Sequence, residues 1–129
     1  HGTTVSAFGS LSLEPPMIYA ALDVRSDLLG LLRRTRRFGV NVLAASQGDL
    51  ALAFARKGVD KFEGVEWCVQ NGLPRLPATS TWIACDVDRL LARGDHVVAL
   101  GTVVGVEPSD LAPLVHYDRR FGTYTDLSP

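Results

Sequence analysis

Two long strand-like stretches joined by a short polar turn constrain the fold of this chain more than any other feature. Residues 81–91 read as one strand and residues 96–106 as its return strand, both rich in apolar and β-branched side chains. The turn between them, Ala92-Arg93-Gly94-Asp95, contains a glycine suited to a tight hairpin. Long antiparallel strands of this kind indicate a mainly β protein, built as a barrel or a sandwich.

Shorter elements are predicted around this hairpin, for a total of about six strands and two short helices. The remaining strands are expected at the start of the chain from Thr3, at residues 17–22 as an apolar run buried on both faces, and at residues 38–43 and 114–117. One helix is expected from Asp27 to about Arg36, with Ser26 as its N-cap. No strand–helix–strand rhythm repeats, so the helices belong at the edge of the β structure.

A second helix is expected to start at Ser46 and to end in the basic turn Arg56-Lys57-Gly58, where glycine is a common stop signal. Residues 59–80 are rich in Gly and Pro and predict a loop. Trp67 and Leu76 are the side chains expected to hold this loop against the core.

Composition sets the broad class of the protein. A chain of 129 residues fits one domain, and its net charge of −1 gives no reason to expect nucleic acid or an anionic membrane as a partner. No apolar run is long enough to span a membrane, and no secretory signal is visible. Cys68 and Cys85 form no CxxC pair and the three histidines lack ligand spacing, so no metal site is predicted. The cysteines are expected to be small packing groups in a reducing cytoplasm.

The opening stretch, Gly2 to Pro16, gathers five hydroxyl side chains before a double proline. Hydroxyls and spare backbone N–H groups at a strand end are suited to hold a phosphate or the polar chain of a cofactor. The same residues are equally consistent with a strand whose Ser and Thr side chains only decorate a turn. Pro15-Pro16 is expected to force an extended path into the next apolar run. Because the chain opens at His1 and runs at once into this stretch, an N-terminal piece of the domain is expected to be missing.

Six sequence blocks in a fixed order resemble those of one known family. The blocks are Thr4-Val5-Ser6-Ala7-Phe8 with Ser10-Leu11-Ser12-Leu13-Glu14-Pro15-Pro16, Arg25-Ser26, Arg37-Phe38-Gly39-Val40-Asn41-Val42-Leu43, Asp60-Lys61-Phe62-Glu63-Gly64, Gly94-Asp95-His96, and Pro113-Leu114-Val115-His116-Tyr117. Their order and spacing, over essentially the whole chain, resemble the flavin reductase family of FMN-binding split β-barrels.

The resemblance implies a fold and an activity. The fold would be an antiparallel split β-barrel with two short peripheral helices, assembled as a homodimer. The activity would be hydride transfer from NADH or NADPH to FMN or FAD, with the reduced flavin passed to a partner monooxygenase in the cytoplasm. The position of Arg25-Ser26 varies in the family, which leaves the choice between FMN and FAD open.

The resemblance also implies two sets of site residues. The cofactor-binding set is Thr4, Val5, Ser6, Ala7, Phe8, Ser10, Leu11, Arg25, Ser26, Asp27 and Lys57. The nicotinamide set is His96, which would orient the nicotinamide ring, together with His116, Tyr117, Asp118 and Arg119.

Each of these residues could also have a purely structural role and bind no ligand. Ser26 fits a helix cap, Lys57 fits a favourable charge at a helix end, and His96 fits an exposed hairpin residue. Two other functions remain open at this point: a flavin-storage protein without turnover, and a split-barrel oxidase of the pyridoxamine-phosphate type.

Overall fold

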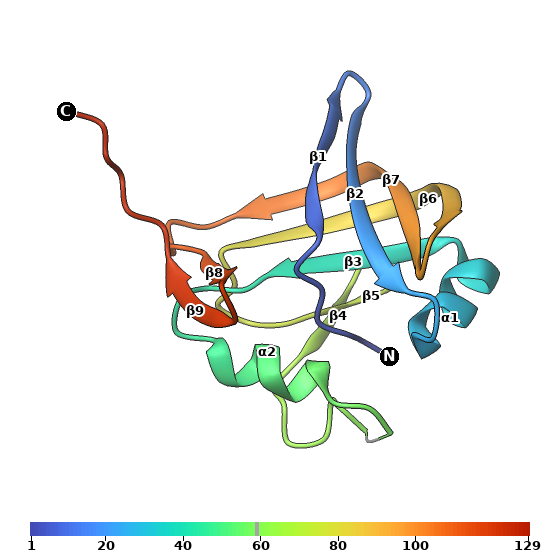
Figure 1. Cartoon of the computed structure of the whole chain (residues 1–129), viewed down its shortest axis with the longest axis horizontal. Coiled ribbons are helices and arrows are strands. Elements are labelled where there is room, and N and C mark those ends of the chain that lie inside the picture. Colours follow the sequence, from blue (N-terminus) through green and yellow to red (C-terminus); the bar gives the residue numbers. More distant parts are fainter. Residues whose placement is uncertain (59) are drawn as a thin grey trace.

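The computed structural model describes residues 1–58 and 60–129 (Figure 1). Within these residues the chain forms nine strands and two helices. The strands are β1 (Phe8–Leu13), β2 (Pro16–Asp23), β3 (Arg37–Val42), β4 (Cys68–Gln70), β5 (Leu73–Arg75), β6 (Thr81–Arg93), β7 (His96–Pro108), β8 (Leu114–Tyr117) and β9 (Arg120–Thr123). The helices are α1 (Asp27–Thr35) and α2 (Gly48–Ala55). The prediction of a mainly β chain with two short helices is confirmed.

An antiparallel sheet of five strands, in the order β1-β2-β7-β6-β3, forms the body of the protein. The predicted long hairpin is its centre: β6 and β7 pair along their whole length around a turn at Gly94 and Asp95. Register shifts at Ala84/Cys85 and Val87/Arg89 mark bulges in this pair, and bulges increase the local twist of a sheet. In the described residues the edge strands β1 and β3 do not pair with each other, so the curved sheet remains open.

The main core lies between α1 and the sheet. Leu29 and Leu32 of α1 are each 2% exposed and pack into it. The strands contribute Ile18, Leu22, Phe38, Ile83, Cys85, Val87, Val97 and Ala99. Gly101 on β7 makes room for this packing, because a Cβ there would lie 2.6 Å from Cζ of Phe38. This core fixes the position of the turn between β2 and α1, and that turn forms one wall of the site described below.

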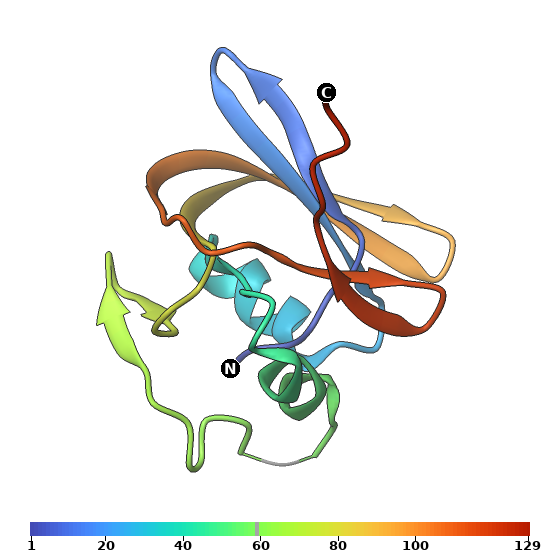
Figure 2. The same ribbon diagram turned by 90° about the vertical axis from the view of Figure 1, so that its left-hand side faces the viewer.

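The first strand differs from the prediction at both of its ends. Residues 3–7 form no strand, and β1 begins only at Phe8. At the other end, Leu13 pairs with Pro16, so Glu14 and Pro15 form the turn of a hairpin with a cis peptide bond between them. The double proline therefore reverses the chain, and the expected extended path is wrong. The resulting β1–β2 hairpin projects beyond the rest of the sheet (Figures 1 and 2).

The next strand and the helices also require corrections. β2 is buried on one face only, through Ile18, Ala20 and Leu22, and the expectation of two buried faces is wrong. α1 begins after Ser26 as predicted. α2 begins at Gly48, with Gln47 and not Ser46 at the N-cap position; the Gln47 side chain caps no helix amide and instead accepts a hydrogen bond from the Ala44 amide in the preceding turn. Among the described residues, neither helix is long and apolar enough to cross a membrane.

α2 ends at Ala55, before the basic residues that were expected to form its last turn. Arg56, Lys57 and Gly58 therefore lie in the loop that follows the helix. The region 60–80 is not only loop, because β4 and β5 form a small hairpin there. Leu76 is buried as expected, whereas Trp67 is 45% exposed.

Cys85 is a buried packing group as predicted, but Cys68 is exposed, so its predicted role is wrong. The predicted strand 114–117 is confirmed as β8. It pairs with β9, which the sequence did not indicate. Both lie at the end of the molecule far from α1 (Figure 1).

Candidate functional site

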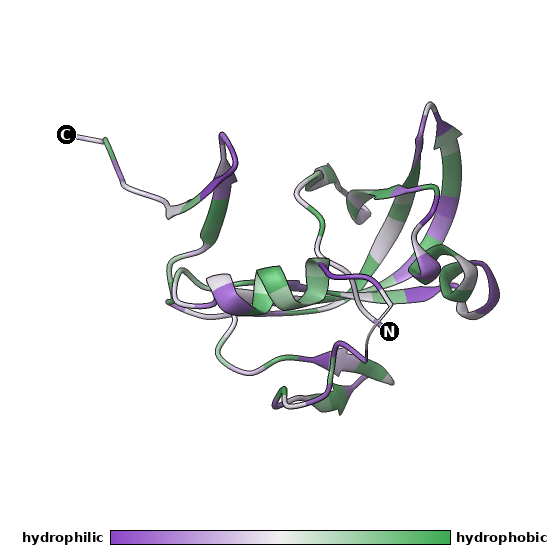
Figure 3. Cartoon of the chain, turned by 60° about the horizontal axis from the view of Figure 1, so that its bottom comes forward, coloured by the Kyte–Doolittle hydropathy of each residue, from purple (hydrophilic) through white to green (hydrophobic). Residues whose placement is uncertain are grey.

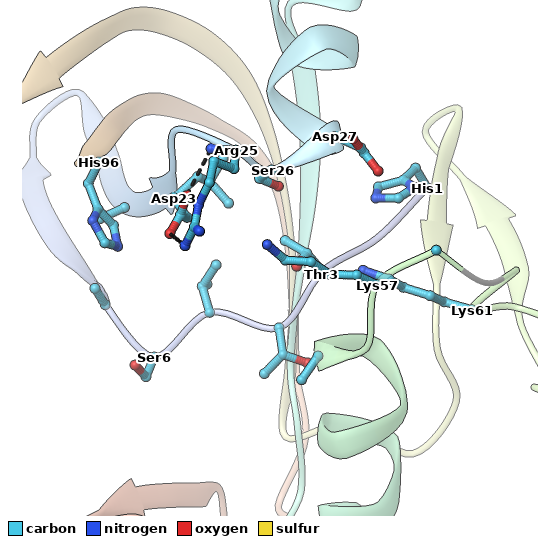
Figure 4. Close-up of a pocket in the computed structure, with 17 residues that line it drawn as sticks. His1, Thr3, Ser6, Asp23, Arg25, Ser26, Asp27, Lys57, Lys61 and His96 are labelled. Atoms are coloured by element: carbon cyan, nitrogen blue, oxygen red, sulfur yellow. Dashed lines mark hydrogen bonds and ion pairs between the residues drawn. The ribbon is translucent and has the colours of Figure 1, made fainter.

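A polar cavity of about 370 Å³ lies where four separate segments of the chain meet. The four segments are the irregular N-terminal stretch, the turn from β2 into α1, the loop after α2, and the start of β7 (Figure 4). The residues that line it are His1, Thr3, Thr4, Val5, Ser6, Ala7, Ala21, Leu22, Asp23, Arg25, Ser26, Asp27, Ala55, Lys57, Gly58, Lys61 and His96. Its size lies within the range of sites for small molecules.

The N-terminal stretch is held in place by bonds to α2 and β2. The Thr4 amide donates to the Phe54 carbonyl at 3.2 Å, and the Thr4 hydroxyl donates to the Ala51 carbonyl at 2.6 Å. The Ala21 amide donates to the Ala7 carbonyl at 2.9 Å. These bonds explain why residues 3–7 do not join a strand: their partners are a helix end and a single β2 amide. The Thr4 hydroxyl proton is thus used within the protein.

The peptide groups between these anchors line the cavity. In the part of the chain that the structure describes, the amide N–H groups of Val5, Ser6 and Ala7 donate to no backbone acceptor. Ser6 is exposed and belongs to the lining of the cavity. These amide groups are free to donate to a polar ligand in the cavity. The stretch that the sequence predicted for binding therefore lines the polar cavity, although the Thr4 hydroxyl, which was counted among the binding groups, already donates to the Ala51 carbonyl.

The turn between β2 and α1 contains a two-pronged ion pair between Asp23 and Arg25. Asp23 accepts hydrogen bonds from the Arg25 amide at 2.8 Å and from the Arg25 guanidinium at 3.0 Å on each carboxylate oxygen. These bonds hold the pKa of Asp23 well below its usual range and raise the pKa of Arg25. The Arg25 side chain is 75% exposed, and its charge is largely compensated by its neighbour.

Ser26 follows as the N-cap residue of α1. Its side chain makes no capping hydrogen bond within the described structure, although its carbonyl accepts from the Leu29 amide at 3.1 Å. The hydroxyl thus remains available beside the N-terminus of a helix, an environment that favours anions. The expectation of a simple cap is correct for the backbone position and incorrect for the side chain.

Two lysines face the same cavity from the loop after α2, and they are the only lysines of the chain. Lys57 is exposed, whereas Lys61 is 8% exposed and donates from Nζ to the Gly2 carbonyl at 2.9 Å. Burial lowers the pKa of Lys61, with nearby Asp27 opposing the shift and Lys57 adding to it. Lys61 was not singled out from the sequence, although its spacing of four residues from Lys57 was visible.

His96 stands at the opposite end of the cavity from the lysines (Figure 4). It is the first residue of β7, and the register of the sheet pairs it with Asp23 of β2. Its Nδ1 lies 2.7 Å from the Asp95 carboxylate, a contact that favours a proton on Nδ1 and leaves Nε2 as the free ring atom. The ring is half-buried, so the alternative of a simple exposed hairpin residue does not describe it fully.

Several predicted site residues lie outside this cavity. Phe8 and His116 line a second, mainly apolar cavity of about 760 Å³ between the sheet and the helices. Ser10 and Leu11 lie on the projecting β1–β2 hairpin, and Tyr117, Asp118 and Arg119 form the exposed tip of β8–β9; none of these five lines either cavity. Residues 10–11 are separated from the cavity because β1 runs outward along β2 from Phe8.

The donor set of the polar cavity fits an anionic ligand such as a phosphate-bearing cofactor better than a metal ion. Unpaired amides, a free hydroxyl at a helix N-terminus and two ammonium groups are all donors. Metal ions require acceptors instead, and no group of three or more His, Cys, Asp or Glu side chains with metal-binding placement occurs among the described residues.

Comparison with known proteins agrees with this chemistry. The family described as "Flavin reductase like domain" matches residues 1–125, so the chain belongs to the flavin reductase family. One relative is the actinorhodin polyketide dimerase of Streptomyces coelicolor, 36% identical over 94% of this chain and 70% of its own length. Another is the reductase component of a 4-nitrophenol 4-monooxygenase/4-nitrocatechol 2-monooxygenase from Rhodococcus opacus, 33% identical over 96% of this chain and 67% of its own length.

The solved structures give the same family. The NADH:FAD oxidoreductase SgcE6 of Streptomyces globisporus, solved with NAD and FAD fragments, superposes with a TM-score of 0.92 at 27% identity. The match covers 98% of this chain and 79% of that one. The split-barrel fold predicted from the sequence is thereby confirmed. Two other relatives, both from Rhizobium meliloti (strain 1021), are much longer than this chain, which spans 36% and 48% of their length.

Proposed function

We propose that this chain is an NADH- or NADPH-dependent flavin reductase that binds FMN or FAD in the polar cavity. The observation that carries the proposal is the meeting of the predicted cofactor residues at one place. Residues 4–7, 25–27 and 57, which are far apart in the sequence, line a single cavity together with His96. The names of related proteins, which include a monooxygenase reductase component and an NADH:FAD oxidoreductase, support the same activity.

Different residues of the cavity bind different parts of the cofactor, one set at each end. A bound flavin supplies the chemistry, because its ring system accepts a hydride from a reduced nicotinamide. The free amides of Val5, Ser6 and Ala7 hold the polar edge of that ring system, near His96. His96 orients the nicotinamide through Nε2, with Asp95 fixing the ring, and performs no obligatory proton transfer. Ser26 and Lys57 hold the anionic end of the cofactor.

A flavin reductase assay tests this proposal. FMN, FAD and riboflavin are each combined with NADH and with NADPH, and nicotinamide oxidation is followed by absorbance. We expect turnover with at least one pair, and a lower nicotinamide-dependent rate in His96→Ala with little change in flavin binding. A protein that binds flavin but oxidises neither nicotinamide would be a flavin-storage protein. Oxidation of a phosphorylated amine without nicotinamide would instead indicate an oxidase.

The proposal extends to assembly and partners. An open sheet with unpaired edges, and exposed apolar side chains such as Val104 (49%) and Val106 (56%) on β7, support a homodimer. α2 is also apolar over most of its length, with Leu52 59% exposed (Figure 3). In such a dimer the distant segment His116–Arg119 serves the nicotinamide at the partner's cavity. Sedimentation velocity tests the assembly, and a fully flavin-competent monomer would contradict it.

The reduced flavin is passed to a monooxygenase in the cytoplasm. Support for the partner comes from the related reductase component of a nitrophenol monooxygenase. The two free cysteines support a reducing compartment. A coupled assay, in which this chain and a flavin-dependent monooxygenase are separated by a dialysis membrane, tests whether free reduced flavin is the carrier.

A further inference from the structure

The five-stranded sheet has an inner face, which packs against α1 and carries the main core, and an outer face, which continues the polar cavity. Side chains alternate between the two faces along β2 and β7, so the residues between the buried ones belong to the outer face. Ala21, Asp23 and His96 are three of these outer residues, and all three also line the cavity. A ligand that fills the cavity can therefore extend onto the outer face.

The register of the sheet arranges this outer face in rows that run across the strands. His96 pairs with Asp23 on one side and with Arg93 on the other, and this first row borders the cavity. Small or apolar side chains form the second row, and the third contains a tyrosine and an arginine. The second row is Ala21, Val98 and Leu91, and the third is Gly9, Tyr19, Leu100 and Arg89.

Tyr19 lies flat on this surface because its neighbour on β1 is a glycine. A Cβ at Gly9 would lie 2.7 Å from the Tyr19 hydroxyl oxygen and 2.9 Å from Cζ of its ring, so the ring covers the β1 backbone. Successive rows on one face are about 6.6 Å apart, which separates the first row from the third by about 13 Å. The small side chains of the second row thus leave a shallow apolar floor beside the Tyr19 ring, on which a planar group can lie.

Two arginines border the same floor. Arg93 lies in the first row and Arg89 in the third, four residues apart on β6. Both are exposed, and within the described residues neither forms an ion pair. Arg93 donates one hydrogen bond to the neutral Ala92 carbonyl at 2.6 Å, which leaves its charge uncompensated. Because the guanidinium group binds phosphate oxygens with paired N–H donors, this side of the floor is suited to a pyrophosphate.

We propose that the outer face binds the adenosine diphosphate part of the nicotinamide dinucleotide. Arg89 and Arg93 bind the pyrophosphate, and the adenine lies on the floor against the Tyr19 ring. The nicotinamide itself lies at His96, where the floor meets the cavity. The inference rests on the proposed function and deepens it, since it assigns affinity for the dinucleotide to residues that contact neither the flavin nor the transferred hydride.

Two hydride donors of different size test this assignment. NADH and reduced nicotinamide riboside carry the same reacting ring, but the riboside lacks the pyrophosphate and the adenosine. KM and kcat for each donor are measured at saturating FMN in wild type, in the double variant Arg89→Met/Arg93→Met, in Tyr19→Leu and Tyr19→Phe, and in Arg34→Met. Arg34 is the matched control, because it is an exposed arginine on α1, which covers the inner face.

The arginines are changed together because exposed charged contacts are individually weak. The double variant should raise KM for NADH about tenfold, with kcat for NADH and both constants for the riboside unchanged. Tyr19→Leu should raise KM for NADH several-fold in the same pattern. Tyr19→Phe, which keeps the ring, and Arg34→Met should behave like wild type. Equal changes for NADH and the riboside, or no change for either, would overturn the inference.

Binding of ADP-ribose separates the subsite from the reductase activity. This compound contains the pyrophosphate and the adenosine but no nicotinamide, so its binding, measured by calorimetry on the whole chain, requires no turnover. It should bind wild type about tenfold more tightly than the double arginine variant, and equal binding or none would contradict the subsite. Arginine-dependent binding without nicotinamide oxidation would refute the reductase and leave the subsite standing. NADH turnover with an unchanged KM in the double variant would do the reverse.

A second copy of the chain is the other possible occupant of the outer face. Sedimentation velocity compares the double arginine variant with wild type and with Arg34→Met. An unchanged oligomeric state together with the loss of NADH affinity supports the inference. Dissociation of the double variant, with the same ratio of KM for NADH and for the riboside as in wild type, would identify the face as a contact between copies and refute it.

Discussion

Replacing Thr4 with valine tests whether this residue anchors the flavin segment or contacts the ligand. Valine keeps the shape of threonine and removes only the hydroxyl, which donates to the Ala51 carbonyl at 2.6 Å. The hydrogen bond from the backbone amide of residue 4 to the Phe54 carbonyl remains possible. We expect the segment 1–7 to detach more often from α2, while the main core of the protein remains intact.

The size of the effect follows from one neutral hydrogen bond. Such a bond contributes about 0.5–1.5 kcal/mol, which corresponds to a factor of about 2 to 10 in the equilibrium constant for detachment of the segment. Since the ligand binds only the ordered segment, the apparent dissociation constant for flavin rises as the attached fraction falls, and by this full factor where the detached state predominates without ligand. FMN and riboflavin should lose affinity equally.

Hydrogen exchange in the absence of flavin supplies the decisive readout. The Thr4 amide should exchange about 2 to 10 times faster in Thr4→Val, and Thr4→Ser, which keeps the hydroxyl, should behave like wild type. If Thr4→Val lost flavin affinity but its amide exchange in the ligand-free protein stayed unchanged, the hydroxyl would contact the ligand directly and the anchoring role would be refuted.

Three further outcomes are expected. Gly101→Ala should destabilise the protein by about 1–3 kcal/mol in urea unfolding, because its Cβ would lie 2.6 Å from the Phe38 ring, whereas flavin binding by the folded fraction should persist. The pKa of Asp23 is lowered in the folded state, so the ionised carboxylate stabilises the fold fully above its ordinary pKa, and this stabilisation is lost as the pH falls below about 4. Asp23→Asn should therefore flatten the dependence of the free energy of unfolding on pH in this range. An unchanged slope would contradict the ion pair. Burial raises the pKa of Cys85 to about 11, so iodoacetamide at pH 8 should label Cys68 alone in the native protein and both cysteines after unfolding.

The parts of the fold that follow from local pattern could be predicted from the sequence. The β6–β7 hairpin was visible because alternating apolar residues flank a glycine turn, and α1 was visible through its cap and leucine spacing. β9 was missed because Arg120–Thr123 is exposed along its whole length, so burial leaves no apolar pattern in its sequence. The start of α2 was misplaced because Gln47, whose side chain caps no helix amide, occupies the N-cap position, so the serine-based capping pattern did not mark the boundary.

In the candidate site, too, some residues could be predicted from the sequence, whereas others depend on contacts that only the fold creates. The family resemblance selected residues 4–7, 25–27, 57 and 96, and the fold brings them around one cavity. Lys61 lies in the block Asp60–Gly64 but was not among the selected site residues, because its burial and its contact with Gly2, 59 residues away in the chain, cannot be read from the sequence. The ion pair that compensates the charge of Arg25 was also hidden. The sequence shows an arginine two residues after an aspartate, but not that the two side chains point toward each other.

The N-terminal stretch has one more consequence, because it lines the polar cavity on one side and the apolar cavity on the other. His1, Thr3, Thr4, Val5 and Ser6 belong to both linings. The stretch is thus a partition only one polypeptide thick, and among the described residues it has no sheet partner to stiffen it. An apolar compound that filled the larger cavity would press from the other side on the peptides that line the polar cavity. Inhibitors of this domain therefore need not resemble a flavin or a nicotinamide.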